Sequence, residues 1–231
     1  MTAETPHQVT FLTERDWTRV ECEYVQSDPY NYSVLDDFFT PEKFTEIREN
    51  LLSGWGWQYK NWQANELYVR DPKIPEIQSV AVELKKQLPK ILDGLEFVRC
   101  WSFMHQRNVG LKVHADDGAV AVNVWMTPDE FNLLPQAGGL VLFDVKRDPT
   151  MLIHEFNTVE RAEQYYKEHT KGASEKIEYG CNRAVLFDAS TFHESDTVSF
   201  REEGAHTYRI NLSLLFDDPE EFTRRRKEYD D

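Results

Sequence analysis

The residues with the clearest chemical potential are a histidine and an aspartate two positions apart, His114 and Asp116. Side chains at positions i and i+2 project from the same face of an extended strand. The imidazole and the carboxylate would therefore point together, as two neighbouring ligands of one metal ion must. Asp117 would point the other way, so it is left out of this set. The pair alone is weak evidence, because a loop histidine beside a turn aspartate has the same sequence pattern.

A third ligand must come from elsewhere in the chain. His193 is the candidate, because it follows a strand-like run and a turn. Two histidines and one carboxylate on one face of an octahedron leave three positions open, the arrangement typical of non-haem Fe(II) oxygenases. These ligand types also suit Fe(II) or Mn(II) better than metals that prefer thiolates. The sequence thus predicts a metal site of His114, Asp116 and His193.

Arg209 is a candidate ligand-binding residue because it lies in an otherwise apolar segment, YRINLSLLF. A guanidinium group keeps its charge, and burying it without a partner is very costly. The carboxylate of a small ligand would be a suitable bidentate partner. The alternative is an exposed edge strand on which the arginine pairs with a surface acid.

The elements that must position these residues change character near residue 96. Before that point the spacing of apolar residues predicts helices with a strand or two. Thr40 followed by Pro41 is typical of a helix start, and that helix is expected to end at Gly54. We also expect a short strand from residue 32 and a second helix over about 76–92.

From residue 96 onward, apolar and polar residues alternate with the two-residue period of strands. The expected strands cover 97–103, 119–125, 139–144, 183–187 and 208–216, and they are rich in β-branched and aromatic residues. Many short strands predict a sandwich or jelly roll. A charged helical excursion at 157–170 interrupts them. The charge run from residue 220 is expected to be a solvated or frayed end.

In their order and context, His114-x-Asp116, His193 and Arg209 resemble the 2-oxoglutarate and Fe(II)-dependent oxygenases. The resemblance covers about 96–216 and includes NVWMTP at 123–128, GGL at 138–140, NRAVLFD at 182–188 and RINLSLLF at 209–216. It implies an α+β, mainly β chain with the double-stranded β-helix (cupin-like jelly-roll) fold and flanking N-terminal helices. We therefore expect a single domain over 1–231, with helical N-terminal support at 1–95, the jelly-roll core at 96–216 and a charged tail at 217–231.

The resemblance also implies the cofactors and the reaction. His114, Asp116 and His193 match the iron ligands, and Arg209 matches the basic residue that binds the distal carboxylate of 2-oxoglutarate. The cofactors would be Fe(II), 2-oxoglutarate as cosubstrate, and O₂. The activity would be oxidation, most simply hydroxylation, of an unactivated C–H bond, with release of succinate and CO₂. Desaturation and ring closure are other outcomes of the same chemistry.

Two asparagines and a tryptophan match less specific positions of the family. Asn211 stands where a serine or threonine often follows the arginine by two, and would assist the same carboxylate. Asn123 is a candidate hydrogen-bond donor to the cosubstrate, with a satisfied interior amide as the alternative. Trp125 lies on the same strand face and is expected to form pocket wall.

The chain also departs from particular subgroups of the family. Animal collagen-type prolyl hydroxylases have lysine where this chain has Arg209. The carboxylate of Asp116 argues against a halogenase, in which a halide replaces it. The stretch 101–106 lacks the tyrosine that is common before the His-x-Asp pair. The four remaining histidines of the core and C-terminal region match no partner pattern and are expected to be surface or packing residues: His105, His154, His169 and His206.

The substrate is poorly specified by the sequence. The tryptophan-rich stretch 55–65 would suit a lid over the site, and packing of helices onto the barrel explains it equally well. The excursion at 157–170 is a second candidate cover. A small molecule such as an amino acid or specialised metabolite is our expectation. Alternatives are a protein or peptide side-chain hydroxylase, a non-catalytic cupin-like binding module, and a metal-dependent oxidase or isomerase that needs no keto acid.

The composition of the chain limits the classes of partner and the cellular compartment that we expect. The 231 residues include 26 Lys+Arg against 41 Asp+Glu, a net charge of −15, which argues against nucleic acid and anionic membranes as partners. Three dispersed cysteines predict neither a disulfide framework nor a zinc pattern. The first residues lack the features of a signal peptide, and no apolar run approaches the roughly 20 residues of a membrane span. We expect a cytoplasmic protein whose oligomeric state the sequence does not indicate.

Overall fold

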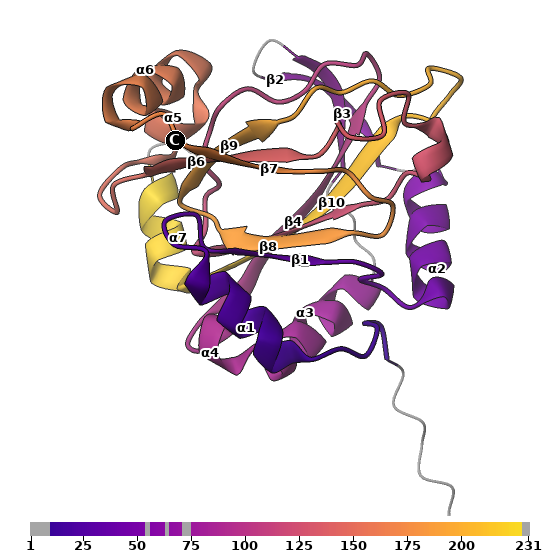
Figure 1. Cartoon of the computed structure of the whole chain (residues 1–231), viewed down its shortest axis with the longest axis horizontal. Helices are drawn as coiled ribbons and strands as arrows, with labels where there is room; N and C mark the ends of the chain where they lie inside the picture. Colours follow the sequence, from indigo (N-terminus) through magenta and orange to yellow (C-terminus); the bar gives the residue numbers. More distant parts are fainter. Residues whose placement is uncertain (1–9, 54–55, 63–64, 71–74, 228–231) are drawn as a thin grey trace, which may run out of the picture.

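The fold is taken from a computed structural model (Figure 1). The structure describes the backbone of residues 10–53, 56–62, 65–70 and 75–227. Side chains are described for these residues except those within 60–75. Its helices are α1 (Trp17–Gln26), α2 (Pro41–Leu52), α3 (Pro75–Gln87), α4 (Pro89–Leu92), α5 (Ile153–Asn157), α6 (Val159–His169) and α7 (Pro219–Arg226), with a 3₁₀ turn, η1 (Asp129–Phe131). Its strands are β1 (Tyr32–Leu35), β2 (Gln58–Trp62), β3 (Asn65–Arg70), β4 (Glu96–His105), β5 (Val120–Trp125), β6 (Leu140–Lys146), β7 (Ser174–Ile177), β8 (Ala184–Asp188), β9 (Thr191–Ser195) and β10 (Arg209–Asp217).

The strands of the described ranges form two antiparallel sheets. The larger has the order β1-β8-β5-β10-β4-β3-β2, and the smaller has the order β7-β6-β9. Some neighbouring strands of the larger sheet are distant in sequence. The last strand, β10, lies between β4 and β5 and pairs with both. This connection of early and late strands is the jelly-roll arrangement that the strand pattern predicts.

Strand alternation divides the larger sheet into two buried faces. On β5, Val122 and Val124 belong to the cluster that the N-terminal helices cover. Ala121 and Trp125 belong instead to the cluster that faces the smaller sheet. Because β-strand side chains alternate, each face collects every second residue. β10 is buried along its whole length for the same reason.

The helices before β4 cover the outer face of the larger sheet. Apolar residues of α2 and α3, such as Leu51 and Leu84, pack in one cluster with β4, β5, β8 and β10. Figure 1 shows α1, α3 and α4 grouped along one side of the molecule, while α5 and α6 lie at the opposite corner. The helices leave the inner face of the larger sheet to the smaller sheet, and the candidate site lies between the two sheets.

The sequence predictions need four local corrections. The helix expected over about 76–92 is two helices, because Pro89 begins α4 and cannot continue α3. Thr40 caps α2 in sequence position only, since its side chain makes no capping hydrogen bond. Two polar strands, β7 and β9, and the β2–β3 hairpin were not expected. The part of the tail up to residue 227 is not a frayed run, because α7 forms at 219–226 and buries Arg225, while 228–231 lie outside the described residues.

The two segments expected to cover the site, 157–170 and 55–65, have different structures. The excursion at 157–170 is helical, as α6, and it packs Tyr165 and Tyr166 against a third apolar cluster that includes Phe143 and Phe192. The tryptophan-rich stretch 55–65, the other expected cover, forms β2 at the edge of the larger sheet and the start of β3, while 55, 63 and 64 lie outside the described residues. Trp57 packs against the helix-covered cluster and its Nε1 donates to the carbonyl of Leu51 at 2.8 Å, as the packing alternative expects. In the described ranges, no helix has both the length and the apolar character needed to cross a membrane.

Candidate metal centre and adjoining pocket

The structure brings His114, Asp116 and His193 together. Each offers one ligand atom, and these atoms lie within 4.8 Å of one another. Nε2 of His114 is 3.9 Å from one Asp116 carboxylate oxygen, and Nε2 of His193 is 3.9 Å from the other. All three residues are buried. One carboxylate flanked by two imidazoles is the donor set that the sequence predicts.

Backbone pairing between distant segments creates this cluster. His114 and His193 form an antiparallel bridge, in which each backbone N–H donates to the other's carbonyl at 2.9 and 2.7 Å. The two rings are consequently 4.4 Å apart. Asp116 follows at i+2, and its N–H donates to the carbonyl of Ala189 at 3.0 Å. These backbone hydrogen bonds hold the loop 114–116 beside β9, so that the side chains of His114 and Asp116 both point towards His193.

The histidine tautomers are fixed by neighbouring carbonyls. Nδ1 of His114 lies 2.7 Å from the carbonyl oxygen of Lys112, and Nδ1 of His193 lies 2.9 Å from that of Thr191. A carbonyl only accepts hydrogen bonds, so both Nδ1 atoms carry the proton. Both Nε2 atoms then present a lone pair towards the cluster. A carbonyl bound to the far ring nitrogen is the usual second-sphere partner of a metal-binding histidine.

Burial sets the protonation states of the cluster. It lowers the pKa of His114 to about 4, with the nearby His193 as the second cause, and it lowers the pKa of His193 to about 4. Burial raises the pKa of Asp116 to about 6, against the opposing effect of His114. At neutral pH both imidazoles are therefore uncharged and the carboxylate is ionised. These are the forms that bind a divalent metal.

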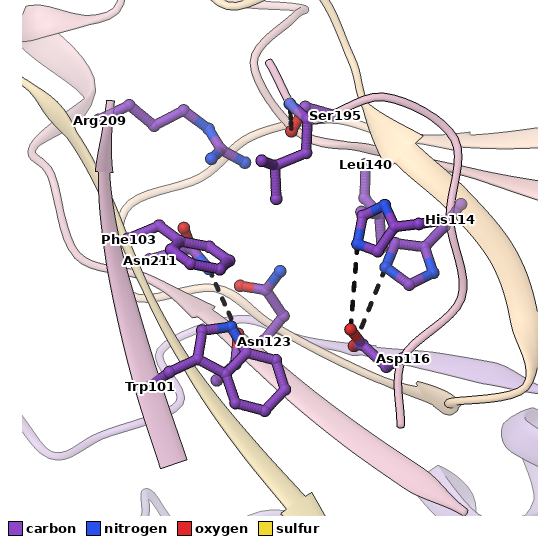
Figure 2. A pocket seen from close by; sticks show the side chains of 12 residues that line it. Trp101, Phe103, His114, Asp116, Asn123, Leu140, Ser195, Arg209 and Asn211 are labelled. Carbon is purple, nitrogen blue, oxygen red and sulfur yellow. Dashed lines mark hydrogen bonds and ion pairs between the residues drawn. The ribbon is translucent and has the colours of Figure 1, made fainter. Parts of the chain in front are cut away.

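A pocket extends from the cluster towards Arg209. Figure 2 shows Arg209 and Asn211 on one side, His114 and Asp116 on the other, and Asn123 between them. The apolar part of the wall consists of Trp101, Phe103, Leu111 and Leu140. β10 supplies the polar side of the pocket, because its inward-facing residues follow one another at every second position.

Two glycines orient the guanidinium group of Arg209. Its Nε donates to the carbonyl of Gly138 at 2.7 Å, and Nη2 donates to that of Gly139 at 3.4 Å. Gly138 has a φ of +86°, which L side chains rarely adopt. A Cβ at Gly139 would lie 1.9 Å from the carbonyl oxygen of Ile177. The GGL segment singled out in the sequence thus needs glycine to bring its carbonyls to Arg209.

Arg209 carries a buried charge that forms no salt bridge within the described part of the chain. Burial lowers its pKa to about 10, so the guanidinium remains protonated at neutral pH. The acid that raises this pKa is Asp196, but its salt bridge is to Lys176, at 2.9 Å. Among the described residues only backbone carbonyls accept hydrogen bonds from Arg209. A buried cation without a counter-ion is costly. An anionic ligand in the pocket would supply the missing charge.

The two asparagines retain unused hydrogen-bonding capacity. Oδ1 of Asn123 and Oδ1 of Asn211 are buried and accept no hydrogen bond from the residues that the structure describes, and Nδ2 of Asn211 donates to Ser213 at 3.3 Å. Buried amide oxygens are normally paired, so a ligand or water is the expected partner. Trp125 is fully buried and stacks on Tyr179 at 5.2 Å, which places it behind the residues that line the pocket.

The structure is similar to solved structures of proteins whose names describe 2-oxoglutarate-dependent or hydroxylating enzymes. The carbocyclase SnoK of nogalamycin biosynthesis, called non-haem and α-ketoglutarate dependent, matches with a TM-score of 0.63 at 10% identity over 89% of this chain and 87% of its own. A prolyl-4-hydroxylase of Pseudomonas putida matches with 0.54 at 13% identity over 91% and 98%. HygX of Streptomyces hygroscopicus, solved with nickel, 2-oxoglutarate and hygromycin B, matches with 0.56 at 11% identity over 85% and 87%. No protein-family model and no curated protein matches the sequence.

The chain has the fold of the 2-oxoglutarate-dependent non-haem oxygenases. The fold class predicted from the strand pattern and the resemblance is confirmed. Identities of this size show the fold alone, so the roles of individual residues rest on the site geometry.

One histidine outside the cluster is paired in the sheet with Arg209. His105, expected to be a surface or packing residue, is a buried packing residue, and β4 pairs it directly opposite Arg209 on β10. Its Nδ1 lies 2.9 Å from the carbonyl oxygen of Val109. Only the strand register brings these two residues together. His154 is partly buried, while His169 and His206 are exposed.

His105 makes the stability of the metal-free protein depend on pH. Burial, followed by the charge of Arg209, lowers its pKa to about 3, whereas an unfolded histidine has a pKa of about 6.5. Between these values the unfolded chain binds a proton that the folded chain does not. The free energy of unfolding should therefore fall as the pH is lowered below about 6.5, by about 1.4 kcal/mol per pH unit from this residue.

Urea unfolding of the wild type and of His105→Phe at pH 7, 6 and 5 tests this expectation. The other titrating groups are common to both proteins and cancel in the difference. The free energy of unfolding of the variant should fall less steeply with falling pH, by about 1.4 kcal/mol less per pH unit than that of the wild type. Parallel curves would show that His105 is protonated equally in the folded and unfolded chains.

Proposed function

We propose that this protein is an Fe(II)- and 2-oxoglutarate-dependent dioxygenase that hydroxylates an unactivated C–H bond of a small molecule and releases succinate and CO₂. The observation that carries the proposal is the pairing of two features in one pocket. The first is the buried cluster of His114, Asp116 and His193. The second is Arg209, a buried cation that forms no salt bridge in the described residues and lies across the pocket from them.

The donor chemistry of the cluster fits Fe(II). Two neutral imidazoles and one carboxylate are the ligands of the non-haem Fe(II) facial triad, which leaves positions open for other ligands. In our proposal His114, Asp116 and His193 hold the metal through Nε2, a carboxylate oxygen and Nε2. The Nδ1 bonds to Lys112 and Thr191 keep both rings oriented when the metal exchanges.

The polar residues opposite the cluster fit the cosubstrate. Arg209 would bind the distal carboxylate of 2-oxoglutarate, and the carbonyls of Gly138 and Gly139 hold the guanidinium in place for it. Asn211 and Asn123 would hydrogen-bond the same molecule through amide groups that the protein leaves partly unpaired. Binding of a dicarboxylate would thus satisfy both the buried charge and the buried amides.

The metal and keto acid, when bound, supply the oxidising chemistry in which O₂ is reduced and 2-oxoglutarate becomes succinate and CO₂. The chain's own contribution is to bind, orient and exclude water. Asp116 offsets part of the metal's charge, and Arg209 sets the direction in which the keto acid lies. Phe103, Leu111 and Leu140 form the apolar wall that limits access of water between these two points.

A small-molecule substrate is favoured over a macromolecule. The net charge of −15 disfavours nucleic acid. HygX holds hygromycin B in its crystal structure, and SnoK is named for nogalamycin biosynthesis. The Pseudomonas putida neighbour is a prolyl-4-hydroxylase, so peptides belong in any substrate screen. A compartment in the cytoplasm remains part of the proposal.

Succinate release with a substrate panel tests the function. Iron-loaded protein is incubated with 2-oxoglutarate, O₂ and separate pools of amino acids, glycosides, polycyclic metabolites and proline-containing peptides. We expect one small-molecule pool to stimulate succinate release and to yield a product heavier by one oxygen atom. Asp116→Ala is the control and should release none. Stimulation by peptides alone would identify a peptide hydroxylase, and iron-loaded protein with no turnover of keto acid under any pool would contradict the proposal.

A further inference from the structure

Two arginines outside the pocket hold the chain segment that follows the first histidine of the cluster. Arg147 lies just after β6, and Arg225 lies in the C-terminal helix α7. Both are buried, and both direct their guanidinium groups at the segment 116–118. Neither lines the pocket. Their contacts therefore call for an explanation other than ligand binding.

Arg147 binds the backbone on either side of Asp117. Its Nε donates to the carbonyl of Asp116 at 3.3 Å, and its Nη2 donates to the carbonyl of Gly118. The guanidinium carbon lies 5.0 Å from the ring centroid of Phe156, which holds the side chain from the other face. Arg147 thus fixes two carbonyls of the turn that carries the carboxylate of the cluster.

Arg225 binds the side chain that points away from the cluster. Its Nε donates to Asp117 Oδ1 at 3.0 Å, and its Nη2 pairs with Asp217. The neighbouring Arg226 donates to the other oxygen of Asp117 at 3.1 Å. Asp117 and Asp217 are both buried, so the arginines of α7 are the counter-ions of two buried carboxylates. The opposite directions of Asp116 and Asp117 are those expected of consecutive residues in extended chain.

The segment also has no room to shift towards the sheet. A Cβ added at Gly118 would lie 2.5 Å from Cγ of Leu215 on β10. Gly118 therefore packs closely against the side chain of Leu215 on the larger sheet. With Leu215 below and the arginines beside it, the segment is enclosed by elements that are far apart in the sequence.

We propose that α7, through Arg225, and the segment directly after β6, through Arg147, position Asp116 for metal binding. Arg225 and Arg147 are positioning residues, because they act on the ligand through Asp117 and through the backbone. The inference rests on the proposed metal site. It assigns the C-terminal helix a part in the site, although none of its residues faces the pocket.

The physical reason is the cost of an unpaired buried charge. Without Arg225, Asp117 and Asp217 would each keep a buried negative charge with weaker compensation. Moving towards solvent would then lower the free energy of the Asp117 carboxylate, because water would solvate its charge. The adjoining Asp116 would move with it. A metal ligand displaced in this way binds less well, because second-sphere partners typically contribute about 10- to 100-fold to metal affinity.

Titration of the metal-free full chain with Co(II), followed by its visible absorption, tests the inference. Arg225→Met should raise the Co(II) dissociation constant about 10-fold and change the Co(II) spectrum. Arg225→Lys, which keeps the charge but not the two-sided hydrogen bonding, should give an intermediate value. Arg224→Met is the matched control on the same helix, since Arg224 is more exposed and binds Glu221 and the carbonyl of Pro149. It should leave both readouts unchanged.

A second control separates positioning from general stability. Leu51→Ala removes buried side chain from the opposite face of the larger sheet, and it should lower the melting temperature without changing the Co(II) affinity or spectrum. If Arg225→Met does not fold, the comparison uses Arg225→Lys and Arg147→Lys. Wild-type Co(II) binding by the folded arginine variants, or equal weakening in Leu51→Ala at matched stability, would overturn the inference. Failure of the wild type itself to bind Co(II), or binding that His193→Ala leaves intact, would instead overturn the proposed metal site.

Discussion

Replacing His193 with alanine is expected to weaken binding of a divalent metal at the site severely. His193 is one of three ligands, and its Nε2 lies 3.9 Å from the carboxylate of Asp116. Its loss leaves two ligands and removes the ring that faces His114. We expect the metal dissociation constant to rise by more than about 100-fold, beyond the range seen for second-sphere partners. Titration of metal-free protein with Co(II) under anaerobic conditions measures the change.

His169→Ala is the matched control for this variant. His169 is exposed on α6, where its Nδ1 lies 2.8 Å from the carbonyl oxygen of Tyr165. It should bind metal like the wild type. Circular dichroism and the melting temperature would establish that His193→Ala is folded. A folded His193→Ala that binds Co(II) as tightly as the wild type would place the metal elsewhere in the chain.

Replacing Arg209 with methionine is expected to weaken binding of 2-oxoglutarate while leaving the metal in place. The guanidinium stays charged at neutral pH, since its pKa is lowered only to about 10. It is held by Gly138 and Gly139 rather than by an acid. Losing one partner of a buried charge pair costs about 2 to 5 kcal/mol. The dissociation constant of the keto acid should therefore rise about 30-fold or more.

Calorimetric titration of the Co(II) protein with 2-oxoglutarate separates the two effects. Arg201→Met is the matched control, because Arg201 is exposed and pairs only loosely with Glu203, at 3.9 Å. It should bind the keto acid normally, and both variants should bind Co(II) like the wild type. Unchanged keto-acid affinity in Arg209→Met would remove the reason for assigning 2-oxoglutarate to this pocket and would favour a reaction that needs no keto acid.

The parts of the site that local pattern encodes could be predicted from the sequence. The i and i+2 spacing puts His114 and Asp116 on one side and turns Asp117 away, and the structure shows both directions. Strands with β-branched and aromatic residues at every second position, such as β5 and β10, were recognised close to their ends. Polar strands such as β7, with the sequence SEKI, carry no such signal and were missed.

The rest depends on contacts between residues distant in the chain. His105 meets Arg209 only through the register of β4 and β10. Arg225 meets Asp117 across 108 positions of sequence. A run such as RRRKEYDD has the same composition whether it is solvated or packed on a buried acid, so composition favoured a frayed tail. Register and tertiary packing, rather than propensity, decide such cases.

The most direct test of the account is an anaerobic titration of the metal-free wild type with Fe(II) and then 2-oxoglutarate, followed by visible absorption. The account predicts a charge-transfer band that requires both additions, is absent in His193→Ala, and needs at least about 30-fold more keto acid in Arg209→Met. Iron bound at the site with no band at any concentration of 2-oxoglutarate would contradict the account.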